Sequence, residues 1–140
     1  MRFFLAAHSD YPSLIAVSVA AGVPYRPGDG VVVLAEEDDR VVGWVEGVVD
    51  GVYSGPGAPC APPHGYVQAV VVDPGCRRRG VGKGLLEAFA HAAWFSGAKW
   101  VFAALDENQG VEARVAWLTS AGFEPVDDPD EKGPVMGRWT

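Results

Sequence analysis

The sequence VVVDPGCRRRGVGKG, residues 70–84, decides the fold that we expect for this chain. It follows the run Gly65–Asp73, whose nearly continuous apolar residues predict a strand that is buried on both faces. Leu85, Leu86 and Phe89 then recur at helical spacing, which predicts a helix from about Val81 to Ser96. Strand, turn and helix therefore follow one another within about thirty residues.

The turn between this strand and this helix has the features of an anion site. A helix N-terminus leaves about four backbone N–H groups unpaired and carries roughly half a unit of positive charge. Glycine has no Cβ, so Gly80, Gly82 and Gly84 let an oxygen-rich ligand approach the backbone. The run Arg77-Arg78-Arg79 adds guanidinium groups. Together these features suit a pyrophosphate.

Two other phosphate-binding loops do not fit this turn. A Walker loop requires lysine directly after its second glycine, but Val81 follows Gly80. A dinucleotide fingerprint that starts at Gly80 requires a third small residue where Leu85 stands. The turn is therefore neither a P-loop nor a Rossmann turn.

The rest of the chain alternates strand-like and helix-like segments. The expected strands are residues 2–7, 31–37, 41–50, 65–73, 100–105, 123–126 and 135–139. The first expected helix has Asp10 as its N-cap and ends at Gly22; the others are residues 81–96, ended by Gly97, and 111–121, ended by Gly122. This order, β-α-β-β-β-α-β-α-β-β, predicts an α/β fold with a mixed sheet, in one domain over residues 1–140. Leu14, Ile15, Val17 and Val19 are the apolar positions of the first helix, and Trp94 is grouped with the core-facing residues of the second.

Two connections between the expected strands are distinctive. The turn Asp38-Asp39-Arg40 joins two strands into a hairpin although it contains no glycine. Residues 51–64 contain four prolines and three glycines, which indicates a loop. That loop is long for a compact domain, so it is either a plain connection or a lid over a substrate.

Composition narrows the classes of function. The chain has 18 acidic and 11 basic residues, a net charge of -7, which argues against nucleic acid as a partner. Four of the basic residues lie between Arg77 and Lys83, so the positive charge is local. The two cysteines, Cys60 and Cys76, match neither a disulfide framework nor a zinc site, and we expect no bound metal. No apolar run reaches the roughly 18 residues that span a membrane, so the expected location is the cytoplasm.

The residues around the turn resemble the GCN5-related N-acetyltransferase (GNAT) family. The acyl-CoA turn of that family is Arg or Gln, two residues, Gly, one residue, then Gly or Ala, and Arg77, Gly80 and Gly82 fill it. Val70 to Pro74 resembles the fourth strand of the family and its exit. Leu85-Leu86 resembles the following helix, and Gly122-Phe123 a later Gly-Phe pair, with Met136 in the last strand. The resemblance covers residues 65–139 most clearly.

This resemblance implies a GNAT-like fold and an N-acetyltransferase that uses acetyl-CoA. The pantetheine arm would lie between splayed fourth and fifth strands, with backbone groups of Val70, Val71 and Val72 beside it. The pyrophosphate would lie on Arg77, Arg78, Arg79, Gly80, Val81, Gly82, Lys83 and Gly84, and Asn108 resembles an asparagine that contacts pantetheine. A primary amine would attack the thioester directly in a ternary complex, without a covalent enzyme intermediate. Family members often form dimers, so a homodimer is one expected assembly.

The catalytic groups are less clearly indicated than the acyl-CoA turn. An alkyl ammonium has a pKa near 10, so a base or a water chain must help to provide the neutral amine at neutral pH. Glu46 and Tyr66 are our candidates; Asp50, His64 and Gln68 are others on flanking segments. The first interpretation of Glu46 is nevertheless a solvent-facing strand residue, and that of His64 is a loop histidine. Cys76 adjoins the pyrophosphate side, which is the wrong place for a nucleophile, so we expect it to fill space.

One position departs from the family pattern. Many members have a tyrosine five residues before the phenylalanine of the Gly-Phe pair, where it protonates the departing thiolate, but this chain has Leu118 there. Two alternatives to an enzyme follow: an acyl-CoA-binding module without catalysis on the same fold, and an interaction domain whose turn binds another anion. The acceptor is open among polyamines, aminoglycosides, amino acids and protein N-termini. Acidic residues at Glu46 and Asp50 favour a cationic amine.

Overall fold

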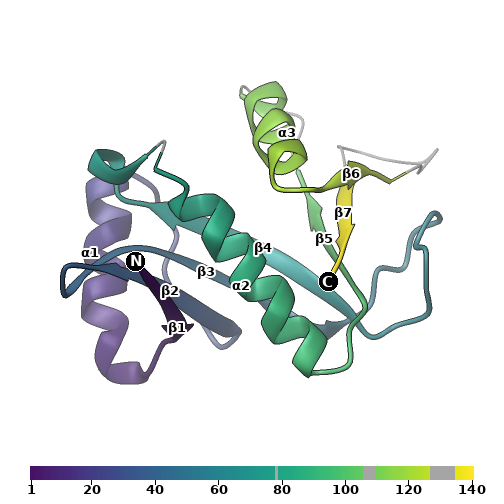
Figure 1. Cartoon of the computed structure of the whole chain (residues 1–140), viewed down its shortest axis with the longest axis horizontal. Coiled ribbons are helices and arrows are strands. Elements are labelled where there is room, and N and C mark those ends of the chain that lie inside the picture. The colour runs from purple at the N-terminus through teal and green to yellow at the C-terminus, as the bar shows by residue number, and fades with distance from the viewer. Residues whose placement is uncertain (78, 106–109, 127–134) are drawn as a thin grey trace. The chain divides into compact units, whose positions relative to one another are not determined.

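The computed structural model describes residues 1–77, 79–105, 110–126 and 135–140. Its elements, in chain order, are β1 (Arg2–Leu5), the 3-10 turn η1 (His8–Asp10), α1 (Tyr11–Ala21), β2 (Val31–Glu37), β3 (Arg40–Gly51), β4 (His64–Val72), η2 (Pro74–Cys76), α2 (Val81–Phe95), β5 (Trp100–Ala104), α3 (Val111–Ser120), β6 (Glu124–Pro125) and β7 (Val135–Trp139) (Figure 1). Over these residues, seven strands form a mixed, mostly antiparallel sheet in the order β1-β2-β3-β4-β5-β7-β6. The predicted α/β class and element order are confirmed.

The chain divides into two compact units. The first consists of Met1–Gly47 with Gln68–Phe89, and the second of Val48–Val67 with Ala90–Thr140. Strands β3 and β4 and helix α2 each run from one unit into the other. The single domain over residues 1–140 stays a prediction.

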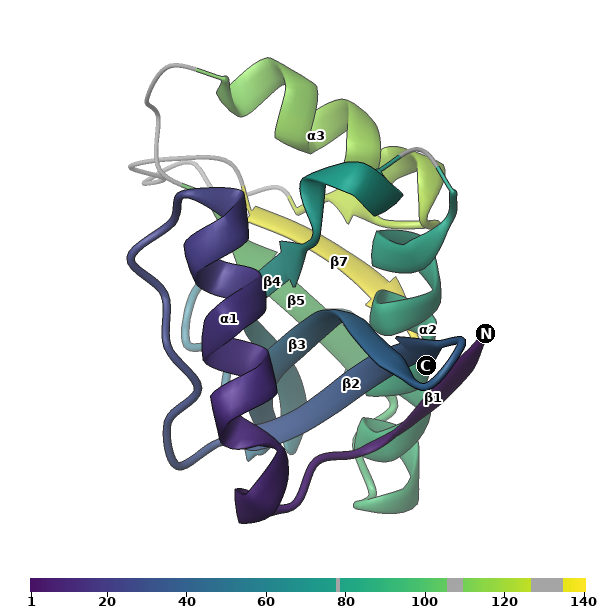
Figure 2. The ribbon, with the colours of Figure 1, turned by 90° about the vertical axis from the view of Figure 1, so that its left-hand side faces the viewer.

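In the first unit, helices cover both faces of the β2–β3 hairpin. Trp44 is fully buried and donates from Nε1 to the carbonyl of Leu14 in α1, at 3.0 Å. Its neighbour Gly43 points to the other face, because side chains alternate along a strand. A Cβ at Gly43 would lie 3.0 Å from Val81 and 3.1 Å from Leu85, both on α2. The two helices therefore lie on opposite faces of this hairpin, and α1 crosses β2 and β3 in Figure 2.

The β2–β3 turn explains how a hairpin forms here without glycine. Asp38 has φ +52° and Asp39 has φ +61°. Positive φ at both central residues is the pattern of a type I′ turn, whose twist matches that of the flanking strands. Aspartate tolerates this left-handed region better than most residues with a Cβ. The predicted bounds of residues 31–37 are confirmed for β2.

Replacing Asp39 with glycine is expected to stabilise the protein. Glycine adopts positive φ without steric cost and is the favoured second residue of a type I′ turn. We expect the free energy of unfolding to rise by about 0.5–1 kcal/mol, the scale of such backbone effects. Thermal denaturation measures this change. Asp38→Ala is the opposite control and should lower the melting temperature; a lower melting temperature for Asp39→Gly would contradict this account of the turn.

In the second unit, aromatic rings pack around β5. Phe102 stacks on Tyr66 with ring centroids 4.7 Å apart and meets Tyr53 edge-on at 5.0 Å. β5 pairs with β7 through five residue pairs but with β4 only through Gly65↔Val101 and Tyr66↔Phe102. Its parallel pairing with β4 therefore covers only the beginning of that strand.

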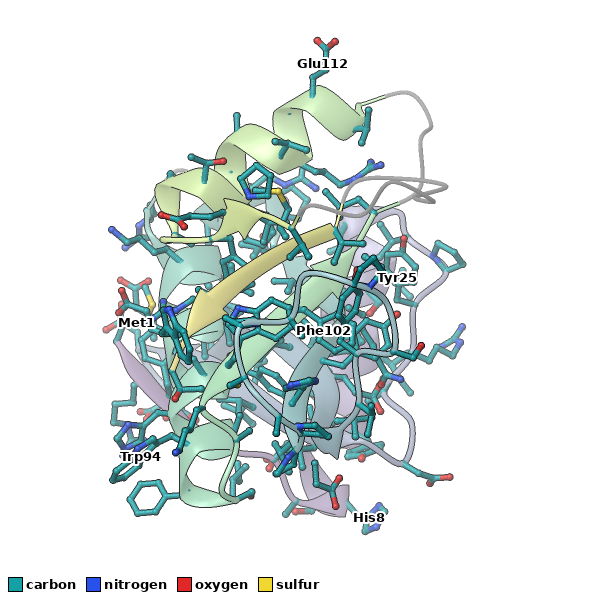
Figure 3. All side chains as sticks on the ribbon, turned by 90° about the vertical axis from the view of Figure 1, so that its right-hand side faces the viewer. Met1, His8, Tyr25, Trp94, Phe102 and Glu112 are labelled. Carbon is teal, nitrogen blue, oxygen red and sulfur yellow. The ribbon has the colours of Figure 1, made fainter. Side chains whose placement is uncertain are left out.

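Several expectations about single residues are wrong. Trp94 is 55% exposed, and Figure 3 shows it pointing away from the ribbon near the end of α2. Asp10 does occupy the N-cap position of α1, but its side chain accepts from the amide of Ala7 at 2.8 Å and makes no capping hydrogen bond to α1. His64 is not a loop residue, because it begins β4 and is 1% exposed. Helical spacing therefore identified α2 correctly but placed Trp94 on the wrong face.

The helix ends follow the prediction. Gly22, Gly97 and Gly122 have φ values of +70°, +95° and +88°. This left-handed conformation suits the residue after a helix C-terminus. Among the described residues, no helix is long and apolar enough to cross a membrane, and no cluster of three or more His, Cys, Asp or Glu side chains could hold a metal ion.

Candidate functional site

The exit of β4 into the basic turn is held by backbone bonds. The amide of Asp73 donates to the carbonyl of Val42 in β3, at 2.9 Å. The Asp73 side chain accepts from the amide of Gly75 at 2.8 Å, and its carbonyl accepts from the amide of Cys76 at 2.8 Å. This Asp-Pro-Gly-Cys sequence therefore forms the short turn η2 (Pro74–Cys76) and returns the chain toward α2.

Helix α2 begins at Val81, directly after the glycine turn, as the sequence predicts. The amide of Gly84 donates to the carbonyl of Gly80 at 3.0 Å. The amides of Val81, Gly82 and Lys83 precede that bond, and the first amides of a helix generally have no acceptor within it. Val81 itself is 1% exposed. Gly80 has φ +80°, and a Cβ there would meet nothing within 4 Å. Glycine is therefore required at this position by the backbone conformation, and not by lack of space for a side chain.

Cationic residues flank these amides in the sequence. Arg77 and Lys83 are exposed, and the Arg79 side chain is half-exposed and forms an ion pair with Glu37 of β2. Arg78 lies outside the described residues. An exposed helix N-terminus with several cations nearby can hold a di-anion such as a diphosphate.

Other residues of this stretch have packing functions. Val71 and Val81 are buried, and Val70 and Val72 are half-buried on β4. A Cβ on Gly84 would lie 2.3 Å from the ring of Phe3, so this glycine gives room to the β1 side chain.

Cys76 is 2% exposed, and its Sγ accepts from Arg40 at 3.5 Å. Its burial agrees with the expected space-filling role.

Glu46 is buried, so the solvent-facing alternative for this residue is wrong. The residue is 8% exposed. Its Oε1 accepts from the amide of Gly28 at 2.9 Å, and its Oε2 accepts from the amides of Gly28 and Gly30 at 3.0 and 2.8 Å. The hydroxyl of Tyr11 also donates to the carbonyl of Gly28, at 3.0 Å. Glu46 therefore fastens the loop between α1 and β2, and its role as a base stays a prediction.

Removing the Glu46 carboxylate should destabilise the protein. Hydrogen bonds to a charged acceptor contribute roughly 1.5–3 kcal/mol each, and water can reach the loop amides once the carboxylate is gone. We expect Glu46→Ala to lower the free energy of unfolding by about 3 kcal/mol and Glu46→Gln, which keeps one carbonyl oxygen, by about 1 kcal/mol. Urea denaturation measures both, with Glu87→Ala on the exposed face of α2 as the control. Unchanged stability with lost turnover would assign Glu46 to catalysis instead.

The remaining predicted site residues lie in the second unit. Tyr66 is half-buried against Phe102, and Asn108 lies outside the described residues. His64 is held on both ring nitrogens: Nδ1 accepts from the amide of Tyr53 at 2.9 Å, and Nε2 is 2.9 Å from the carbonyl of Cys60. The proton therefore belongs on Nε2. His64 fastens the loop that it follows, and nothing in this bonding leaves it free to act as a base.

Leu118 is 2% exposed in α3. It packs in the core of the second unit, and its side chain has no hydroxyl group that could donate a proton. A cavity of about 380 Å³ also lies in this unit, beside Trp100, Glu124 and Trp139. None of the predicted site residues that the structure describes lines it.

The comparisons with known proteins decide the family. The sequence model of the acetyltransferase (GNAT) family matches residues 5–123. The chain belongs to the GNAT family. It is therefore an acyl-CoA-dependent N-acetyltransferase, and acetyl-CoA is the usual co-substrate of such proteins. No curated protein matches the sequence.

Solved structures show that this GNAT chain has the fold of its family. The GNAT domain of S. lividans PAT has 17% identity and a TM-score of 0.76, with 99% of this chain and 90% of that one covered. The ribosomal-protein-S18-alanine N-acetyltransferase from Escherichia coli has 15% identity and a TM-score of 0.70, with 99% and 92% covered. An aminoglycoside 6′-N-acetyltransferase complexed with coenzyme A has 14% identity and a TM-score of 0.70, with 99% and 97% covered.

The sequence did not predict the contacts of two residues with the segment that leads from β4 to α2. Glu37 and Arg40, at the ends of the β2–β3 turn, contact the segment that runs from Asp73 to Arg79. Their charges are opposite to those of their partners, but about 40 residues of sequence separate them. A strand-end glutamate is common, so no local signal in the sequence could have indicated these contacts.

Proposed function

We propose that this GNAT protein transfers an acetyl group from acetyl-CoA to a primary amine, and that the diphosphate of the coenzyme binds at the beginning of α2. The observation that carries the proposal is the left-handed Gly80, at φ +80°, which turns the chain into the helix between exposed cations. The amides of Val81, Gly82 and Lys83 then donate to the phosphate oxygens. Arg77, Arg78 and Arg79 neutralise the charge.

Strand β4 would hold the pantetheine arm. Its pairing with β5 covers Gly65 and Tyr66 only, which supports a strand whose later residues are available to a ligand. Val70 and Val72 are half-buried and near the C-terminal end of β4. Their backbone groups would bond the amides of the arm, with Val71 and Asn108 as further candidate contacts.

The reaction would proceed by direct attack in a ternary complex. The amine nitrogen forms a bond to the thioester carbonyl carbon, the carbon–sulfur bond breaks, and the electron pair leaves with sulfur. The nitrogen loses its proton to a base or to water, for which Glu46 and Tyr66 remain the candidates. A thiol has a pKa of about 8.5, so the thiolate is a tolerable leaving group without an acidic side chain at Leu118.

An assay of coenzyme A release tests the proposed function. The wild-type protein is incubated with acetyl-CoA and a panel of polyamines, aminoglycosides, amino acids and peptides. We expect release that depends on one amine class, with a cationic amine favoured by the net charge of -7. Acetyl-CoA binding without turnover on any amine would instead support the non-catalytic module, and absence of binding would contradict both.

A further inference from the structure

Both ends of the β2–β3 turn contact the segment from Asp73 to Arg79, which leads from β4 to α2. These contacts lie within the first unit. Glu37 Oε1 accepts from Arg79 Nη2. Arg40 donates from Nη2 to Cys76 Sγ at 3.5 Å, and its Nη1 lies 4.0 Å from Asp73 Oδ2. Glu37 and Arg40 are themselves register partners across β2 and β3. The end of the β2–β3 hairpin therefore contacts the segment before α2 through one anionic side chain, Glu37, and one cationic side chain, Arg40.

Glu37 is the fixed half of its ion pair. Its side chain is 23% exposed, whereas that of Arg79 is 52% exposed. Glu37 Oε2 is buried and has no hydrogen-bond partner among the described residues. The hairpin behind it is a tight turn with positive φ at Asp38 and Asp39. The carboxylate is therefore the anchor, and the guanidinium is the group that it holds.

We propose that Glu37 is a positioning residue for the coenzyme A site, which it serves by fixing the guanidinium of Arg79. A guanidinium has five N–H donors in a planar fork, and the ion pair with Glu37 uses Nη2. Its other donors bond no side chain or carbonyl among the described residues and remain for a phosphate oxygen. A long side chain that is ordered before the ligand arrives loses less freedom on binding. This inference rests on the proposed function.

A competing role for Glu37 would be to block the site, with the diphosphate displacing it from Arg79. The geometry favours positioning. Displacement would leave a largely buried carboxylate without its cation, which is strongly unfavourable. Addition of the ligand to unused donors avoids that loss. The diphosphate thus joins the pair instead of breaking it.

Isothermal titration with coenzyme A tests the role of Glu37. Glu37→Gln keeps an oxygen that accepts from Arg79 and should bind within about 2-fold of the wild type, whereas Glu37→Ala should bind about 5-fold more weakly. Arg79→Ala should also bind more weakly, and adding Glu37→Ala to it should cause no further loss. In turnover assays, Glu37→Ala should raise KM for acetyl-CoA and leave kcat unchanged. Glu36→Ala is the matched control, since Glu36 forms the same kind of pair with Arg2.

Three results would contradict this inference, and each would do so for a different reason. Equal or tighter binding by Glu37→Ala would overturn the inference and indicate the blocking role. Equal weakening by Glu37→Ala with and without Arg79 would assign the effect to general destabilisation and overturn it as well. Failure of the wild-type protein to bind coenzyme A would overturn the proposed function, and with it this inference.

Discussion

The double replacement Arg77→Glu and Arg79→Glu is expected to weaken coenzyme A binding at least 100-fold. Charge-assisted hydrogen bonds contribute about 1.5–3 kcal/mol each, and every 1.4 kcal/mol corresponds to a factor of about ten in Kd. Two such contacts therefore account for 100-fold or more, and the new carboxylates add repulsion toward the diphosphate. Isothermal titration of the purified variant measures the loss.

A matched charge change elsewhere shows whether the effect is local. Lys99 is an exposed cation outside the first unit, so Lys99→Glu alters the net charge in the same direction away from the turn. We expect Lys99→Glu to bind coenzyme A like the wild type. The Arg77 and Arg79 variant loses the ion pair with Glu37 and should melt at a lower temperature, so its binding is measured at a temperature where circular dichroism shows that it is folded. Equal binding by all three proteins would show that the basic turn is not the diphosphate site.

Among glycine-to-alanine replacements at described glycines of the second unit, Gly137→Ala is expected to cause the largest loss of stability. A Cβ on Gly137 would lie 2.1 Å from Cζ2 of Trp100. Trp100 is 3% exposed and meets His64 edge-on at 5.4 Å, so its neighbours limit how far its ring can shift. Overpacking of this kind costs about 1–3 kcal/mol, and we expect about 3 kcal/mol here. Urea denaturation measures the free energy of unfolding.

A second glycine in the same unit provides the control for Gly137→Ala. A Cβ on Gly51 would lie 3.4 Å from its nearest neighbour, an ordinary contact, so Gly51→Ala should change stability by less than about 0.5 kcal/mol. Combining Gly137→Ala with Trp100→Leu should cost less than the sum of the two single changes, because the smaller side chain relieves the overlap. Strict additivity would contradict the proposed overlap with Trp100.

Local patterns in the sequence were sufficient to predict the element order and the basic turn. The valine run of β4, the glycines at 80 and 82 and the helical spacing of Leu85 and Phe89 are all close in sequence. The helix ends at Gly22, Gly97 and Gly122 likewise depend on a single residue with positive φ. Such features need no knowledge of the tertiary structure, and the match to the GNAT family over residues 5–123 agrees with them.

Features that depend on distant contacts could not be predicted in this way. Glu46 looks like an exposed strand residue until the amides of Gly28 and Gly30, more than 15 residues earlier, are placed beside it. Trp94 has the spacing of a core residue but is exposed near the end of α2. The proposed positioning role of Glu37 depends on its ion pair with Arg79, which lies 42 residues later. In each case the partner is set by the tertiary fold and not by the neighbouring sequence.

A crystal structure with coenzyme A bound tests the central claim most directly. The account predicts diphosphate oxygens within hydrogen-bonding distance, about 2.7–3.2 Å, of the amides of Val81, Gly82 and Lys83. It also predicts that Arg79 contacts both a phosphate and Glu37. Coenzyme A bound elsewhere, with these amides occupied by side chains of the protein itself, would contradict it.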